Sequence, residues 1–411
     1  MTDNEPLFLG RQPILDQDQK VVAFELLFRS NESNRAEISD DFTATATVIN
    51  HAFNEFGIEA ALGPYLGFIN MSESLLMSDV IEILPKAKIV MEILETVKIN
   101  RALIERCKLL KAAGFRLALD DFTDFTPGVE PLLDLVDIVK VDILSVEQGK
   151  LAEIAGKIKQ RPIRLLAEKV DSIAQFEHCK MLGFDLFQGY YFAKPQIIKG
   201  KRLSPSEITL MKLLGQVMAD AEEMEIETTL KENPLLSLNL LRLANSVACG
   251  AKQKATSIRT AITVLGRRQL QRWVQILLYS NSGHEHFPSP LLQLAAMRGM
   301  LMELLSSRKG DPEFSENAFM TGIMSLMETL LSMPIDSILS SLSVKQEVME
   351  ALTARSGDLG RLLALVEELE KDNADNIESC MAQCAYISFH DLNIAQAEAF
   401  KWSNSIAEVN E

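Results

Sequence analysis

The sequence contains 411 residues, of which 47% are hydrophobic and 24% are charged. This composition is typical of a soluble globular protein, and the length exceeds what one hydrophobic core usually serves, so we expect two domains. The formal charge of −16 disfavours non-specific binding to nucleic acid, because phosphate binding requires clustered Lys and Arg. An anionic ligand is still compatible with this charge where metal ions mediate its binding.

No apolar run approaches the roughly 18–20 residues that span a bilayer, so we expect no membrane insertion. The N-terminal segment carries acids early and has neither a basic flank nor a sustained apolar core, which argues against a signal peptide. The five cysteines are scattered and odd in number, which argues against a disulfide framework. We therefore expect a cytoplasmic protein.

The first half of the chain alternates between apolar segments, expected to be strands, and amphipathic segments, expected to be helices. The expected strands are 21–28, 65–70, 88–94, 115–121, 137–144, 163–169 and 184–192. The expected helices include 73–82, 98–113, 145–159 and 172–182. Strands alternating with helices favour a largely parallel sheet, and so many units within residues 1–196 suit a barrel better than an open sheet.

The second half has a different pattern. Residues 197–206 are polar and contain proline and glycine, which predicts a linker. From residue 207 onward apolar residues recur at helical spacing and strand-like alternation nearly vanishes. We therefore expect an α/β domain at 1–196 and an all-helical domain at 207–411.

Nearly every expected strand of the first half carries a charged or amide side chain at or near its C-terminal end. These residues are Glu25, Asn70, Glu92, Asp120, Asp121, Lys140, Asp142, Glu168 and Gln188, with Glu95 just beyond its strand. Each one alone has an ordinary interpretation as a surface turn or a half-buried acid. In a parallel barrel, however, the strand ends converge on one mouth, where crowded acids need cations to compensate them.

Oxygen ligands favour Mg²⁺ or Mn²⁺ over zinc. The expected ligands of a first ion are Glu25, Asn70, Glu92 and Asp120, with Asp121 or Asp142 at a second ion. Two ions about 3.5–4 Å apart commonly hold a phosphodiester for in-line hydrolysis. Lys140 is then expected to neutralise a water or phosphoryl oxygen, and Glu168 to accept the proton of the attacking water.

Seven motifs of the first half stand in the order of a known family. They are Glu25-Leu26-Leu27-Phe28-Arg29, Asn70-Met71-Ser72, Glu92 with Glu95, Asp120-Asp121-Phe122, Asp137 with Lys140 and Asp142, Ala167-Glu168, and Gln188-Gly189-Tyr190. On these motifs, about residues 5–196 resemble the EAL-domain phosphodiesterases. The resemblance implies a TIM-like (β/α) barrel that linearises cyclic di-GMP to pGpG with two metal ions. It also implies that Arg29 holds a phosphate of the ligand, that Gln188 lies near the substrate, and that Glu95 supports the loop after Asp121.

Three departures from the family pattern count against catalytic activity. The Ala-Leu of the signature is Leu26-Leu27, and the Gly and second Glu of the Ala-Glu-Gly-Val-Glu motif are Lys169 and Asp171. The flexible Gly-Thr/Ser-Gly loop that usually follows Asp-Asp-Phe is the bulkier segment 123–128, which contains a proline. Two hypotheses therefore stay open: a metal-dependent cyclic di-GMP phosphodiesterase, or a degenerate barrel that only binds cyclic di-GMP or a partner protein.

The helical half carries a second set of motifs. They are Asn233-Pro234, Leu241-Arg242, Asn245-Ser246, Ser257-Ile258, Ala261 and Leu265-Gly266. On these residues it resembles the HDOD domain, a relative of the HD-type phosphohydrolases without their catalytic residues. Ser325 and Leu326 stand where HD enzymes carry His-Asp, so we expect a regulatory or docking module that binds a protein partner. The resemblance is also compatible with a homodimer.

Overall fold

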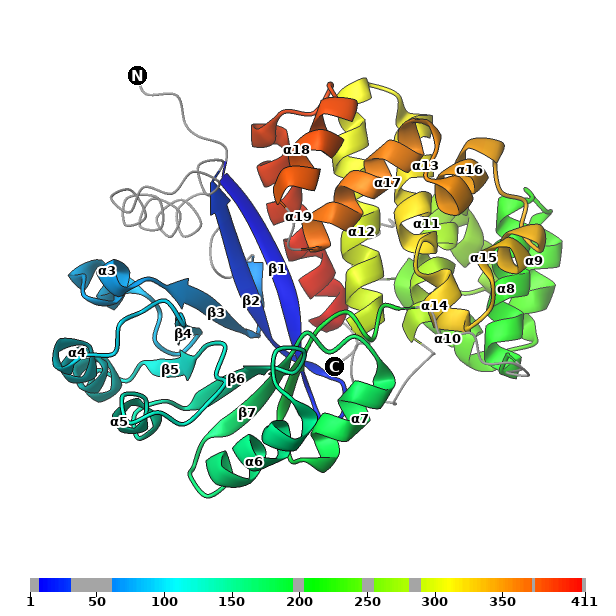
Figure 1. Cartoon of the computed structure of the whole chain (residues 1–411). Helices are drawn as coiled ribbons and strands as arrows, with labels where there is room; N and C mark the ends of the chain where they lie inside the picture. Colours follow the sequence, from blue (N-terminus) through cyan, green and yellow to red (C-terminus); the bar gives the residue numbers. More distant parts are fainter. Residues whose placement is uncertain are drawn as a thin grey trace. The chain divides into compact units, whose positions relative to one another are not determined.

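The computed structural model describes residues 7–30, 61–194, 203–245, 255–280, 290–371 and 374–408. By their internal contacts, these residues belong to two compact units, one made of 1–194 together with 365–411, the other of 195–364. The first unit contains a β-barrel and the second is helical (Figure 1). None of the helices in the described ranges combines the length and apolar character needed to cross a membrane.

Eight strands close into one barrel, in which neighbours in sequence are neighbours in the sheet. They are β1 (Leu7–Asp16), β2 (Val21–Ser30), β3 (Leu66–Met71), β4 (Ile89–Ile93), β5 (Arg116–Leu119), β6 (Ile138–Asp142), β7 (Arg164–Glu168) and β8 (Leu186–Gln188). Strand β1 is antiparallel to both β2 and β8, and the other neighbours are parallel. The expected α/β barrel followed by a helical region is confirmed.

The helices between the strands follow the sequence expectation with one correction. They are α3 (Glu73–Leu76), the 3₁₀ helix η3 (Asp79–Ile83), α4 (Arg101–Ala112), α5 (Glu130–Leu133), α6 (Gln148–Ile158) and α7 (Ile173–Met181). The helical stretch expected at 73–82 is divided into two short helices, because Ser78 lies between them in an extended conformation and its hydroxyl accepts a hydrogen bond from the amide of Val80. Serine at such a position favours the start of a new helix over continuation of the old one.

Strand β1 was not expected from the sequence. Its centre, Gly10 to Pro13, contains glycine, arginine, glutamine and proline, so that apolar alternation is lost there. Pairing with β2 and β8 nevertheless holds it in the sheet. At β8 the predicted strand is too long, since only Leu186–Gln188 of the expected 184–192 is strand.

One apolar side chain from each strand builds the centre of the barrel. The buried cluster consists of Ile14, Ala23, Phe68, Val90, Ala118, Ile138, Leu166 and Leu186. Because successive side chains of a strand alternate between faces, the residues two positions away also point into the barrel. This apolar layer therefore forms the floor beneath the next inward-facing layer.

The described part of the helical unit consists of helices that differ widely in length. They are α8 (Pro205–Met218), α9 (Glu223–Lys231), α10 (Pro234–Ala244), α11 (Ile258–Ser280), α12 (Pro290–Ser306), η5 (Ser307–Lys309), α13 (Pro312–Met324), α14 (Met327–Leu331), α15 (Ile335–Ser340) and α16 (Gln346–Ala354). Ser204 and Glu207 form a capping box at the start of α8. Helices α12 and α13 approach closely at two glycines, because a Cβ on Gly322 would lie 2.7 Å from the amide nitrogen of Gly299.

The end of the chain belongs to the barrel unit, unlike the expected helical domain that ran to residue 411. Helix α17 (Gly357–Glu370) contains the boundary between the units, and α18 (Ala374–Gln383) and α19 (Phe389–Glu408) follow it in the barrel unit. Helix α19 packs beside β1 (Figure 1). The guanidinium of Arg11 lies 4.1 Å from the Phe24 ring and 4.3 Å from the Phe400 ring. A strand that was not expected thus anchors the last helix.

Replacing Arg11 with alanine should lower the free energy of unfolding of the barrel unit by about 2–4 kcal/mol. The side chain donates to Ala61 O at 2.8 Å, Ser403 Oγ at 2.9 Å and Asn404 Oδ1 at 3.2 Å, and all three acceptors would lose their donor. Urea unfolding followed by circular dichroism measures the change.

The matched control is Arg161→Ala, since Arg161 pairs with Glu130 and Asp134 at the surface. Its loss should cost at most about 1 kcal/mol. Equal destabilisation by the two substitutions would contradict an anchoring role for Arg11.

Candidate functional site

A complete layer of polar side chains lies next to the apolar floor of the barrel. On β2 to β8, the inward-facing residue two positions after each floor residue has a charged or amide side chain. On the antiparallel strand β1, the corresponding residue lies two positions before the floor residue. The layer consists of Gln12, Glu25, Asn70, Glu92, Asp120, Lys140, Glu168 and Gln188. Seven of these eight were expected from the sequence. Gln12 was missed, because it lies in β1 and precedes a proline.

The ammonium group of Lys140 is the centre of this layer. Lys140 is 1% exposed, and its Nζ lies 2.8 Å from Glu92 Oε2, 2.9 Å from Glu168 Oε1, 3.0 Å from Asp120 Oδ1 and 3.4 Å from Glu25 Oε2. These acids come from four different strand ends, so only closure of the barrel brings them together. One cation thus faces four carboxyl groups in a water-poor interior.

This crowding perturbs the protonation of the layer. Burial disfavours the charged form of Lys140, but the four acids outweigh it and hold its pKa well above the ordinary value. Burial, together with the charges of Glu25 and Asp120, raises the pKa of Glu92 in spite of Lys140. Burial also raises the pKa of Glu168 to about 7. The structure therefore places in Glu168 a carboxyl group that exchanges protons near neutral pH.

Amide side chains fix the orientation of Glu25. Asn70 Nδ2 donates to Glu25 Oε1 at 3.2 Å, and Gln188 Nε2 donates to Glu25 Oε2 at 2.6 Å. The same Gln188 nitrogen lies 2.9 Å from Gln12 Oε1, which accepts from it. Gln12, which we did not expect from the sequence, therefore helps to orient Gln188 and, through it, Glu25.

The free oxygens of the layer fit a divalent cation. Among the described residues, Asn70 Oδ1, Glu92 Oε1 and Gln188 Oε1 are buried without a hydrogen-bond partner, and Asp120 Oδ1 has only its ion pair with Lys140. Within the same part of the chain, no three His, Cys, Asp or Glu side chains are arranged to hold an ion by themselves. Asn70 contributes an amide oxygen to the free donors, and the Lys140 ammonium lies between the acids. Such all-oxygen donors suit Mg²⁺ or Mn²⁺.

A second group of charges adjoins the polar layer. Lys169 Nζ lies 2.5 Å from Asp142 Oδ2, and this hydrogen bond, with those from Ser145 and Leu144, lowers the pKa of Asp142 although burial opposes it. Burial and the charge of Asp120 raise the pKa of Asp121, which Lys169 partly offsets. Asp121 and Asp142 thus lie outside the ring around Lys140 and next to a different lysine.

The remaining expected residues fall at the edges of the site. Glu95 is exposed beyond β4, near enough for its charge to raise the pKa of Asp121, after burial and Asp120. Arg29 lies on β2, but its side chain is outside the described part of the chain. Gly189 is required next to Gln188, because a Cβ there would lie 2.1 Å from the carbonyl oxygen of Val170.

The loop after Asp121 is anchored to helix α6 and to the strand beside it. The amide of Phe122 donates to Lys140 O at 2.9 Å, and its ring contacts the Phe125 ring at 5.1 Å between centroids. Asp124 pairs with Lys150 at 2.8 Å, and Lys157 lies 4.9 Å from the Phe125 ring. Aromatic packing and two lysines of α6 thus hold a segment where the family pattern has a flexible, glycine-containing loop.

The helical unit has no equivalent chemistry at its HD position. Ser325 Oγ accepts from Arg298 Nη1 at 2.9 Å and donates to Gly322 O at 2.7 Å. Leu326 is buried. Neither side chain supplies the imidazole or carboxylate that an HD-type metal site requires.

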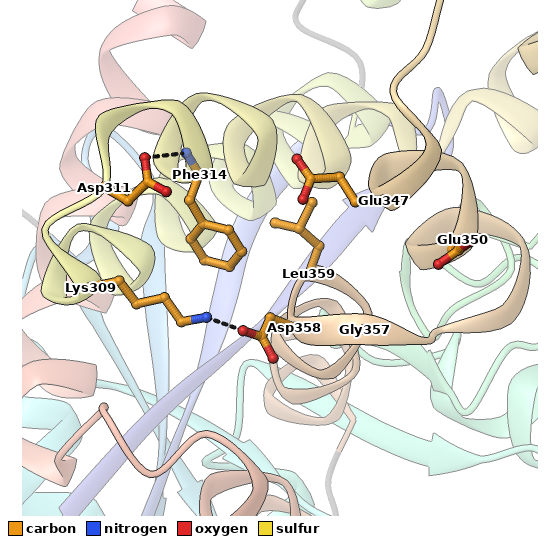
Figure 2. A pocket seen from close by; sticks show the side chains of 8 residues that line it. All are labelled: Lys309, Asp311, Phe314, Glu347, Glu350, Gly357, Asp358 and Leu359. Atoms are coloured by element: carbon orange, nitrogen blue, oxygen red, sulfur yellow. Dashed lines mark hydrogen bonds and ion pairs between the residues drawn. The ribbon is translucent and has the colours of Figure 1, made fainter.

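A hollow of about 370 Å³ in the helical unit is lined by charged side chains from several helices (Figure 2). Lys309 pairs with Asp358, and its ammonium lies 4.1 Å from the Phe314 ring. Asp311 accepts from the amides of Glu313 and Phe314, as a helix cap does. The charged groups that Figure 2 shows in contact are satisfied by one another or by the backbone.

Comparison with known proteins also separates a barrel domain from a following helical domain. The EAL domain model matches residues 3–195, and the HDOD domain model matches 207–353. The uncharacterized protein YuxH of Bacillus subtilis is 33% identical over 98% of this chain and 99% of its own length. The chain belongs to the EAL-domain proteins that carry a following HDOD domain. The cyclic di-GMP phosphodiesterase CdgJ of Vibrio cholerae is 32% identical over 97% of this chain and 93% of its own.

Solved structures of EAL proteins also match the first half. A standalone EAL protein from Vibrio cholerae O395, bound to c-di-GMP, is 24% identical with a TM-score of 0.39, covering 47% of this chain and 93% of that chain. A manganese and cyclic di-GMP complex of Klebsiella pneumoniae BlrP1 is 22% identical with a TM-score of 0.40, covering 46% of this chain and 56% of that chain.

Replacing Lys140 with methionine should lower the free energy of unfolding by about 3–5 kcal/mol in metal-free buffer, because four buried acids lose their cation. Adding Glu92→Gln should recover part of the loss, since it removes the most deeply buried of those acids. Chemical denaturation in the presence of EDTA measures both effects. Lys150→Gln, which breaks an exposed ion pair, should cost at most about 1 kcal/mol and serves as the control. A tolerated Lys140→Met would contradict the central role of this ammonium.

Proposed function

We propose that this protein hydrolyses cyclic di-GMP to linear pGpG with the help of two Mg²⁺ or Mn²⁺ ions. In this proposal Glu25, Asn70, Glu92 and Asp120 hold one ion, and Asp121 and Asp142 lie at the second. Such ions, when bound, supply positive charge to the phosphoryl oxygens and make water more acidic. The single observation that carries the proposal is the layer of buried oxygens around Lys140, with free lone pairs on several strands.

The side chains of the layer have distinct tasks in the reaction. Glu168 accepts the proton of the water that attacks phosphorus, which suits a carboxyl group whose pKa burial has raised to about 7. The P–O3′ bond breaks as the water oxygen bonds to phosphorus, the departing O3′ takes up a proton from solvent water, and Glu168 returns its proton to solvent. Lys140 stabilises negative charge on the phosphoryl oxygens or orients the water, Gln188 orients Glu25 beside the substrate, and Arg29 binds a phosphate. Glu95 supports the loop after Asp121.

Family membership supports the ligand class. The relative CdgJ is named a cyclic di-GMP phosphodiesterase and matches nearly the whole of both chains. In the polar layer of this chain, each position that belongs to a family motif carries an acid or an amide, except Lys140, which is the lysine of its motif.

A second candidate function is a receptor that binds cyclic di-GMP without hydrolysing it. The observations that favour it are the ion pair between Lys169 and Asp142 and the anchored loop after Asp121. In both proposals the helical unit regulates the barrel or relays its state to a protein partner, because its HD position holds Ser325 and Leu326. A homodimer remains part of this proposal.

The test is to incubate the purified full chain with cyclic di-GMP and either Mg²⁺ or Mn²⁺ and to measure linear pGpG by chromatography. Glu25→Ala and Glu168→Ala should each lower kcat by at least about 10²-fold, because one removes an ion ligand and the other the proton acceptor. EDTA should abolish turnover reversibly.

Lys159→Gln is the matched control, because Lys159 pairs with Asp185 outside the polar layer and should leave kcat within about twofold. Ligand binding without turnover with either ion would replace the enzyme by the receptor. Turnover that survives Glu168→Ala would overturn the assignment of the proton acceptor.

A further inference from the structure

Lys169 has a backbone conformation that its residue type disfavours. Its φ is +56°, in the left-handed region where a Cβ is crowded and glycine is favoured. It directly follows Glu168 at the end of β7, at the position where the family motif carries glycine. Holding a lysine in this conformation costs free energy, which favourable contacts of its side chain must offset.

That compensation is the ion pair with Asp142. Lys169 Nζ lies 2.5 Å from Asp142 Oδ2, although more than half of the lysine side chain is exposed and the carboxylate is 5% exposed. The lysine therefore reaches inward from the surface to a buried acid. The same ammonium interacts electrostatically with Asp121 and Glu168. An ordinary surface ion pair has neither a buried partner nor a strained backbone.

The pair also leaves Asp142 without free acceptor capacity. Its Oδ2 accepts from Lys169 and from Ser145 Oγ at 2.7 Å, and its Oδ1 accepts from Leu144 N at 2.8 Å and from Ser145 N at 3.3 Å, which fills the four acceptor positions of a carboxylate. Asn70 Oδ1 and Glu92 Oε1 differ from the Asp142 oxygens, because they are buried without a hydrogen-bond partner among the described residues. Both ends of the site therefore hold a lysine ammonium, but only the end around Lys140 keeps buried oxygens without a hydrogen-bond partner.

We propose that the Lys169 ammonium is a built-in counter-ion at the Asp121–Asp142 end of the site and that it weakens binding of the second divalent ion there. The inference rests on the proposed two-ion site. The ammonium and a divalent ion repel each other and compete for Asp142 Oδ2, so the second ion enters only when Lys169 swings away. The second ion then binds more weakly than it would with an uncharged residue at position 169. Exposure of the lysine stem lets a ligand phosphate or a partner acid draw it outward.

The experiment is a titration of the full chain with Mn²⁺ alone, followed by electron paramagnetic resonance of the free ion, with no nucleotide present. The wild type should bind one ion tightly and a second weakly. Lys169→Gly removes the charge in a conformation that glycine adopts freely, and it should tighten the second ion by about tenfold or more. Lys169→Arg keeps the charge and should behave like the wild type.

Lys159→Gln controls for the change in net charge, because it also removes one lysine charge from the same unit, and should leave both dissociation constants within about twofold. Unchanged binding of two ions by Lys169→Gly would overturn the inference and leave the proposed function standing. Binding of no Mn²⁺ by any variant, or binding unaffected by Glu25→Ala, would overturn the proposed metal site itself.

Discussion

The burial of one ammonium among four carboxyl groups is the constraint on which the barrel unit depends. Lys140 is almost fully enclosed, and its Nζ lies within 3.4 Å of acids from β2, β4, β5 and β7. Uncompensated charges in such an interior would cost several kcal/mol each. The fold tolerates these acids because closure of the sheet brings their cation to the same height. Such an arrangement lowers folding stability relative to an apolar layer, because buried charges lose their hydration.

The two sides of β1 connect this layer to the end of the chain. Gln12 points inward and accepts from Gln188, while its neighbour Arg11 contacts Phe24, Phe400 and the polar groups of α19. Because successive side chains of a strand point to opposite faces, Arg11 contacts the last helix while the adjacent Gln12 faces the site. A single strand thus contacts both α19 and the polar layer.

The departures from the family pattern have physical counterparts in the structure. Lys169 takes a left-handed conformation and neutralises Asp142, and the segment after Asp121 is held by Phe122 and by lysines of α6. Both replace a flexible, glycine-containing element by one with its own contacts. Together they give the Asp121–Asp142 end of the site a lysine of its own and a loop held by side-chain contacts.

The sequence alone determined the barrel class, the helical second half and most of the polar layer. The reason is that a period of two on buried strands fixes which residues share a face, and Glu25, Glu92 and Glu168 stand out against apolar neighbours. Only the tertiary structure decided the rest. Strand β1 lacks apolar alternation and is held by its pairing with β2 and β8, so Gln12 could not be recognised beforehand. The separation of Asp142 from the Lys140 ring, and the packing of α19 on the barrel unit, depend on contacts between residues far apart in sequence, which no local pattern records.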